Sequence, residues 1–220
     1  KALADYFGQN KVTMVQPGYE SPVQYLIDEG YLSQPSFKVL EYTIPSISKE
    51  SMSSLDDENA IYELSLVDDR NSAIIQIIED EHSNGSYIIV FACNVEHAIS
   101  LSHALNYIGI AAVSLTSSFD KDSNIRREKI DRYKSGDVRV IVNYGILTTG
   151  FDAPKTNVAI IARPTKSLVL YSQMVGRAMR GYKSGGNKNC RIYTVNDDIK
   201  QFKNVNYAFI NWNKNYNEND

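Results

Sequence analysis

Apolar runs alternate with amphipathic stretches along the second half of the chain. The run YIIVF at residues 87–91 is continuously apolar and lies between an Asn-Gly turn and a polar helix start, as is typical of a strand buried on both faces. Four later runs have the length and the bounds of strands, at residues 110–115, 138–142, 158–161 and 191–195.

Helical patterns separate these apolar runs. Asn94 is placed to cap a helix that runs to Tyr107, and Ser123 is placed to cap a basic helix that runs to Tyr133. Strands that alternate with helices imply βαβ crossovers. We therefore predict an α/β domain over residues 84–196, with a mainly parallel sheet that is covered on both faces.

Residues 1–45 do not read as a freestanding domain. Ser21 followed by Pro22 predicts the start of a helix that Gly30 ends. Apolar and polar residues alternate over residues 37–44, which predicts one strand.

Residues 46–83 are predicted to be a linker with short helices. Residues 46–59 are polar and rich in serine, with an Asp-Asp-Glu cluster, which indicates a linker or a mobile loop. Residues 60–67 and 72–80 show short helical patterns. At the other end of the chain, residues 197–220 are predicted to form one more helix, packed by aromatic side chains, and a frayed tail.

The composition is that of a globular protein, with 43% hydrophobic and 22% charged residues. No apolar run approaches the roughly 18 residues of a membrane span, and no signal-peptide pattern opens the chain, so we expect a cytoplasmic protein without membrane contact. Cys93 and Cys190 lack paired spacing and the three histidines form no motif, which indicates neither a disulfide nor a metal site.

The net charge of −3 hides an asymmetry. Residues 121–191 carry 15 Lys and Arg against 5 Asp and Glu, a net charge of +10, so the rest of the chain carries −13. A basic stretch within an acidic chain indicates a local anionic partner, either a nucleotide or a nucleic acid. The alternative is that several of these side chains merely solvate helix faces.

The candidate chemistry centres on YSQMVGRAMR at residues 171–180. On a helix, Gln173, Arg177 and Arg180 stand at i, i+4 and i+7 and share one face, while apolar residues bury the opposite face. Guanidinium groups bond phosphate oxygens bidentately, so the pattern suits a polyanion. The alternative is an amphipathic surface helix with two solvated arginines.

These residues resemble motif VI of superfamily 2 helicases and translocases, whose pattern Q-x-x-G-R-x-x-R is matched by Gln173, Gly176, Arg177 and Arg180. The stretch TTGFDAPKTNVAIIARPTKS resembles their motif V and the strand and loop after it. The likeness is greatest to the DEAD/DEAH-like helicase subunits of type I and type III restriction systems. It implies a three-layer RecA-like domain of the P-loop NTPase type, with residues 1–45 as a connector from a missing upstream motor domain.

The resemblance implies nucleotide contacts for several residues. Arg177 and Arg180 would reach the γ-phosphate of ATP as catalytic residues, and Gln173 would help to position them. Further nucleotide contacts are implied for Gly150, Asp152 and Gly176. From its chemistry alone, Asp152 suits a ribose hydroxyl, a water or an arginine, or is simply a turn former before Pro154.

The resemblance also implies contacts to the backbone of one nucleic-acid strand. Matched by position, these contacts fall on Asn94, Thr116, Ser117, Asn143 and Tyr144. Hydroxyl and amide groups would follow phosphates without reading sequence. Many superfamily 2 proteins carry Thr and Asp where this chain has Tyr144 and Gly145. Whether this chain makes the family's contacts at these two positions is therefore open.

The sequence contains no G-x-x-x-x-G-K-[ST] and no Asp-Glu pair after an apolar strand. We therefore expect ATP and Mg²⁺ to be bound mainly by an upstream RecA-like domain of the same protein, and the isolated chain to be inactive as an ATPase. The predicted function is that of the second motor domain of a helicase or translocase, with double-stranded DNA as its track and restriction or repair subunits as further partners.

Two other functions remain open from the sequence. One is a RecA-like adaptor that only binds nucleic acid or protein. The other is a different α/β enzyme, such as a nucleotide-sugar transferase. The choice between DNA and RNA, and between strand separation and translocation, is open too.

Overall fold

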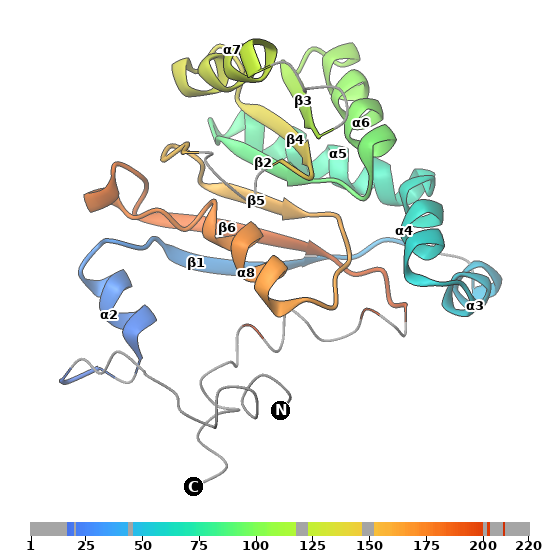
Figure 1. Cartoon of the computed structure of the whole chain (residues 1–220), viewed down its shortest axis with the longest axis horizontal. Coiled ribbons are helices and arrows are strands. Elements are labelled where there is room, and N and C mark those ends of the chain that lie inside the picture. Colours follow the sequence, from blue (N-terminus) through green and yellow to red (C-terminus); the bar gives the residue numbers. More distant parts are fainter. Residues whose placement is uncertain are drawn as a thin grey trace, which may run out of the picture.

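The computed structural model describes residues 17–19, 21–43, 46–117, 123–146 and 152–199, together with residues 202 and 209. Six strands form one sheet in the spatial order β1-β6-β5-β2-β4-β3, and all neighbouring strands run parallel (Figure 1). The strands span Gln34–Leu40 (β1), Ile88–Phe91 (β2), Ala112–Thr116 (β3), Val140–Tyr144 (β4), Val158–Ile161 (β5) and Asn189–Val195 (β6).

Helices cover both faces of this sheet. Ile89 and Phe91 of β2 face a core that includes side chains of α7 and α8, whereas Ile88 and Val90 face a core that includes side chains of α5 and α6. A three-layer, RecA-like α/β domain is therefore confirmed. The described helices are α2 (Pro22–Asp28), α3 (Ser46–Ser54), α4 (Asp57–Ser65), α5 (Asp68–Ser83), α6 (Val95–Tyr107), α7 (Ser123–Ser135), α8 (Leu168–Gly176) and the 3₁₀ turn η1 (Tyr182–Ser184).

The N-terminal region is built into the same fold. Ser21 caps α2, because its hydroxyl accepts a hydrogen bond from the Gln24 N–H at 3.1 Å, and Gly30 follows the helix with φ +78°. The strand expected over residues 37–44 begins and ends earlier, as β1, because its seven residues pair with the seven residues of β6. Residues 1–16 lie outside the described residues.

The linker prediction for residues 46–59 is wrong, since α3 and the start of α4 occupy this stretch. The carboxylate of Asp56 accepts a hydrogen bond from the Asn59 N–H at 2.9 Å and so caps α4. Asp57 and Glu58 fill the first turn, where negative charge is favourable beside the positive end of the helix dipole. The acidic cluster therefore marks the start of a helix.

The helix expected over residues 72–80 is longer, because α5 extends by several residues at both ends. Its Ile74 and Ile78 are fully buried against the sheet, and burial of such a side chain stabilises a fold by about 1.5–3 kcal/mol. Both α5 and β1 precede residue 84 but share the sheet and core with later residues. The fold therefore has no visible boundary at residue 84.

The strands β3 and β4 each begin two residues later than expected. Ile110 donates its N–H to the Leu105 carbonyl at 2.9 Å, and Val138 donates its N–H to the Arg132 carbonyl at 3.1 Å. These apolar residues therefore close the turns that follow α6 and α7, as residues just beyond a helix commonly do.

The C-terminal stretch contacts the core through Phe209. Its ring centroid lies 6.0 Å from that of Phe37 and 5.4 Å from that of Tyr171. Of the other residues in the predicted final helix and tail, the structure describes only residues 197–199 and Phe202.

Candidate functional site

Because the strands are parallel, their carboxyl ends meet at one edge of the sheet, where ligands of such sheets bind. Ser117 follows β3, Asn94 lies three residues after β2, and Arg163 lies two residues after β5. Asn143 and Tyr144 end β4. The structure thus brings these predicted strand-end positions to a common edge, whereas Gly150 lies outside the described residues.

The arrangement expected for the arginine motif is partly wrong. Helix α8 ends at Gly176, and Arg177 is its C-cap residue with φ −68° and ψ −31°. Arg180 lies beyond the helix and forms an antiparallel bridge with Leu32. Gln173, Arg177 and Arg180 therefore do not share one helical face, because pairing with a distant segment draws the chain out of the helix.

Arg180 instead contacts the predicted nucleotide residue Asp152. Its Nη1 lies 2.5 Å from the Asp152 Oδ1, and the two side chains are 37% and 61% exposed. Partial burial and the nearby Arg180 lower the pKa of Arg177, while Asp152 opposes this shift. Two guanidinium groups and one carboxylate therefore interact here. An ion pair this exposed adds only about 0–1 kcal/mol of stability, so a phosphate is able to compete for Arg180.

A small cavity of about 90 Å³ lies beside the end of β4, and its lining includes Asn143, Tyr144, Gly145, Arg163 and Gln173. The Arg163 guanidinium stacks over the Tyr144 ring, 4.9 Å from its centroid. Asn143 is only 4% exposed, and its buried Oδ1 has no hydrogen-bond partner among the residues that the structure describes. Arg163 is an expected strand-end residue, although it is not among the predicted nucleic-acid contacts. Its position two residues beyond an apolar strand is the signal that was available.

The side chains of two residues predicted to bind nucleic acid are hydrogen-bonded or buried within the domain. Asn94 accepts a hydrogen bond from the His97 N–H at 2.7 Å and donates one to the Ser65 hydroxyl at 3.0 Å. Thr116 is 1% exposed. In contrast, Ser117 is exposed, and a Cβ on Gly145 would lie 3.0 Å from its hydroxyl oxygen.

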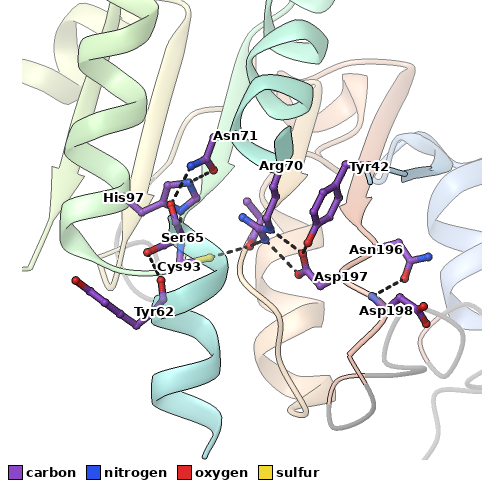
Figure 2. Close-up of polar contacts among 11 residues, drawn as sticks. Tyr42, Tyr62, Ser65, Arg70, Asn71, Cys93, His97, Asn196, Asp197 and Asp198 are labelled. Carbon is purple, nitrogen blue, oxygen red and sulfur yellow. Dashed lines mark hydrogen bonds and ion pairs between the residues drawn. The ribbon is translucent and has the colours of Figure 1, made fainter. Parts of the chain in front are cut away.

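A buried polar cluster lies near the same edge (Figure 2). Arg70 is fully buried; its Nε donates to the Asp197 Oδ1 at 2.6 Å, and its Nη2 donates to Asp197 Oδ2 at 3.2 Å and to the Ala162 carbonyl. Tyr42 donates its hydroxyl to the same carboxylate at 2.7 Å. The cluster joins α5 to the chain just beyond β1, β5 and β6. Sequence reasoning missed it, because an arginine in an acidic helix resembles any solvated residue.

His97 belongs to the neighbouring part of this cluster. Its Nδ1 accepts the Cys93 N–H at 3.1 Å, so the ring proton belongs on Nε2, 2.9 Å from the Asn71 Oδ1. Burial and the charge of Arg70 lower the pKa of His97 to about 3. The ring is therefore neutral at physiological pH.

Within the described ranges, no group of three or more His, Cys, Asp and Glu side chains is arranged to hold a metal ion. Among the described helices, none is long and apolar enough to cross a membrane.

Comparisons with known proteins show which protein family has this fold and sequence. The sequence matches the family described as the helicase conserved C-terminal domain over residues 69–182. It is 32% identical over 162 residues to a 51.5 kDa protein of a Lactococcus phage, covering 72% of this chain and 34% of that protein. It is 31% identical over 180 residues to a Schizosaccharomyces pombe protein described as the mitochondrial ATP-dependent helicase irc3, covering 80% of this chain and 28% of that protein.

A solved fragment described as the HsdR subunit of a type I restriction enzyme from Vibrio vulnificus YJ016 has a similar fold. Its TM-score is 0.64 at 22% identity, over 94% of this chain and 38% of that one. The RecA-like fold and the sequence match define a motor-type domain of superfamily 2. The chain belongs to the helicase conserved C-terminal domain family, and it spans about a third of the length of these two relatives.

We predict that Arg70→Ala destabilises the fold strongly. Removing one partner of a buried ion pair leaves the other charge uncompensated, which costs about 3–5 kcal/mol. Urea unfolding measures this loss. Arg127→Ala is the control, because Arg127 and its partner Asp131 are 83% and 63% exposed. Its effect should stay within about 0.5 kcal/mol, and equal losses in the two variants would contradict the account.

Stability should also depend on pH through His97. Since its pKa is about 3 in the folded state and 6.5 in its ordinary state, only the unfolded chain gains a proton between these values. The contribution of His97 to the free energy of unfolding is therefore fully present above pH 6.5 and is lost as the pH decreases. Between pH 7.5 and 5, the wild type should lose about 2 kcal/mol more than His97→Asn, as measured by urea unfolding. Parallel losses in both proteins would refute this assignment.

Proposed function

We propose that this chain is the second motor domain of an ATP-dependent superfamily 2 helicase or translocase that acts on double-stranded DNA. The observation that carries the proposal is the cluster of Arg177, Arg180 and Asp152 in a RecA-like domain with a parallel sheet. Guanidinium groups in such a cluster suit the γ-phosphate of a nucleotide.

In this proposal, Arg180 and Arg177 meet the γ-phosphate of ATP, and Asp152 holds Arg180 while no phosphate competes. Gln173 is exposed on α8 and helps to position them, and Gly150 and Gly176 contribute nucleotide contacts. The sequence contains no phosphate-binding loop, so an upstream RecA-like domain binds most of the ATP and the Mg²⁺. The isolated chain is accordingly inactive as an ATPase.

The nucleic-acid strand runs along the ends of β3 and β4. Ser117, Asn143 and Tyr144 contact its backbone, and Arg163 supplies a cation beside them. Asn94 and Thr116 contribute through main-chain groups, because their side chains are bonded or buried within the domain.

Double-stranded DNA is the proposed track because of the net charge of +10 over residues 121–191 and the fold shared with a protein named as a restriction enzyme subunit. Restriction or repair subunits are the proposed partners.

Arg180→Ala, made in the protein that includes the upstream domain, should abolish ATP turnover. An arginine that stabilises the transferring phosphoryl group contributes roughly 10³ to 10⁵ in turnover, so a loss of at least about 10³ is expected. Nucleic-acid affinity should change less than about twofold, because Arg180 contacts no track in this proposal. Steady-state ATPase and fluorescence anisotropy measure the two quantities.

The matched control is Arg139→Ala, just before β4, whose guanidinium contacts His82 rather than Asp152 or Arg177. Its turnover should remain normal. Full turnover in Arg180→Ala would refute the catalytic assignment, and an adaptor function would then be favoured.

Arg163→Ala should weaken DNA binding regardless of sequence. Loss of one phosphate contact reduces the slope of log K against log salt concentration by about 0.9. Tyr144→Ala removes the ring that holds the guanidinium and should weaken binding in the same direction, whereas Tyr144→Phe keeps the stack and should lose less affinity. Salt titrations of duplex binding test this, and an unchanged slope in Arg163→Ala would contradict it.

A further inference from the structure

A short segment before β1 is bonded directly to the chain around Arg180. We call residues 30–33 the clamp segment. Leu32 forms an antiparallel bridge with Arg180 itself. Two backbone hydrogen bonds flank this bridge, from the Ser33 N–H to the Met179 carbonyl at 2.9 Å and from the Gly181 N–H to the Tyr31 carbonyl at 3.0 Å. The backbone on both sides of Arg180 is therefore held by residues nearly 150 positions earlier in the chain.

Ser33 adds a side-chain contact. It is fully buried, and its hydroxyl oxygen lies 2.5 Å from the Arg180 carbonyl and 2.6 Å from the Asn187 carbonyl. A hydroxyl has one proton, so it donates to one of these carbonyls at a time. The Asn187 side-chain amide in turn donates to the carbonyls of residues 154–156 at 3.1–3.3 Å. One hydrogen-bonded chain thus runs from the clamp segment through Arg180 to the stretch just after Asp152.

Glycines let these backbones approach each other closely. A Cβ on Gly181 would overlap the carbonyl of Gly30, and a Cβ on Gly186 would overlap the carbonyl of Arg180. Gly30 also has φ +78°, a conformation that other residues resist, and the Tyr182 ring occupies the place of its missing side chain. The backbones of the clamp segment and of the chain around Arg180 are therefore too close to admit a side chain at these glycine positions.

We infer that the clamp segment positions Arg180 and that Ser33 is a positioning residue for it. The clamp sets the place of the guanidinium relative to Asp152, since both belong to one hydrogen-bonded frame. It also joins Arg180 to α2, because the Tyr31 and Leu32 N–H groups bond the Leu26 carbonyl, and both lie in the stretch proposed as the connector from an upstream motor domain. A displacement of that connector would move the backbone of Arg180. This inference rests on the proposed function of Arg180.

The test is Ser33→Ala in the protein that includes the upstream domain. Positioning acts on the transition state, so kcat should fall about tenfold while the KM for ATP and the affinity for ADP change less than about twofold. Affinity for ADP with fluoroaluminate, a mimic of the transferring phosphoryl group, should fall about tenfold as well. Ser86→Ala is the matched control, because Ser86 is equally buried and hydrogen-bonded but precedes β2 and bonds Glu81 rather than the chain around Arg180. It should bind the mimic normally.

A double-mutant cycle separates positioning from general damage. In an Arg180→Ala background, Ser33→Ala should no longer weaken binding of ADP with fluoroaluminate, because the residue that it positions is absent. Should Ser33→Ala fail to fold, Ser33→Cys replaces it in the test, because the thiol is a larger but weaker donor. An unchanged kcat, or an equal loss of mimic affinity with and without Arg180, would overturn the inference. Full turnover in Arg180→Ala would instead overturn the proposed function.

Discussion

The common direction of the six strands determines where the predicted nucleic-acid contacts gather. Side chains far apart in sequence, such as Ser117, Tyr144 and Arg163, reach one edge only because β3, β4 and β5 end there. Each strand is held in register by parallel pairing and by two apolar cores, so the sheet fixes the spacing of the strand ends. Loops at such an edge supply contacts while the sheet supplies their spacing.

Two arginines at opposite ends of the parallel strands contrast in burial. Arg70 is fully buried, where an unpaired charge is strongly unfavourable, and its pairing with Asp197 fixes the chain beyond three strands. Arg180 is 37% exposed and its pair with Asp152 contributes little stability, so it is able to change partners. The rigid pair thus supports the edge, and the exchangeable pair suits a ligand site. The clamp segment connects the Arg180–Asp152 pair to the N-terminal region.

The sequence predicts the parts of this fold that local pattern determines. The apolar runs mark β2, β5 and β6 within two residues, and Asn94 and Ser21 mark the starts of their helices, because burial and capping act over a few positions. The failures depend on distant partners. Arg180 leaves the helical pattern because it pairs with Leu32, and Arg70 is buried only because Asp197 lies beyond the last strand. The nucleotide and nucleic-acid roles come from motif resemblance rather than from pattern.

The central claim is that this domain completes an ATP-driven motor on nucleic acid, and ATP turnover tests it most directly. The measurement compares the chain joined to its natural upstream half with the chain alone, adding duplex DNA, single-stranded DNA or RNA. The account predicts turnover that duplex DNA stimulates in the joined protein and none in the isolated chain. Turnover by the isolated chain, or no stimulation by any nucleic acid, would contradict it.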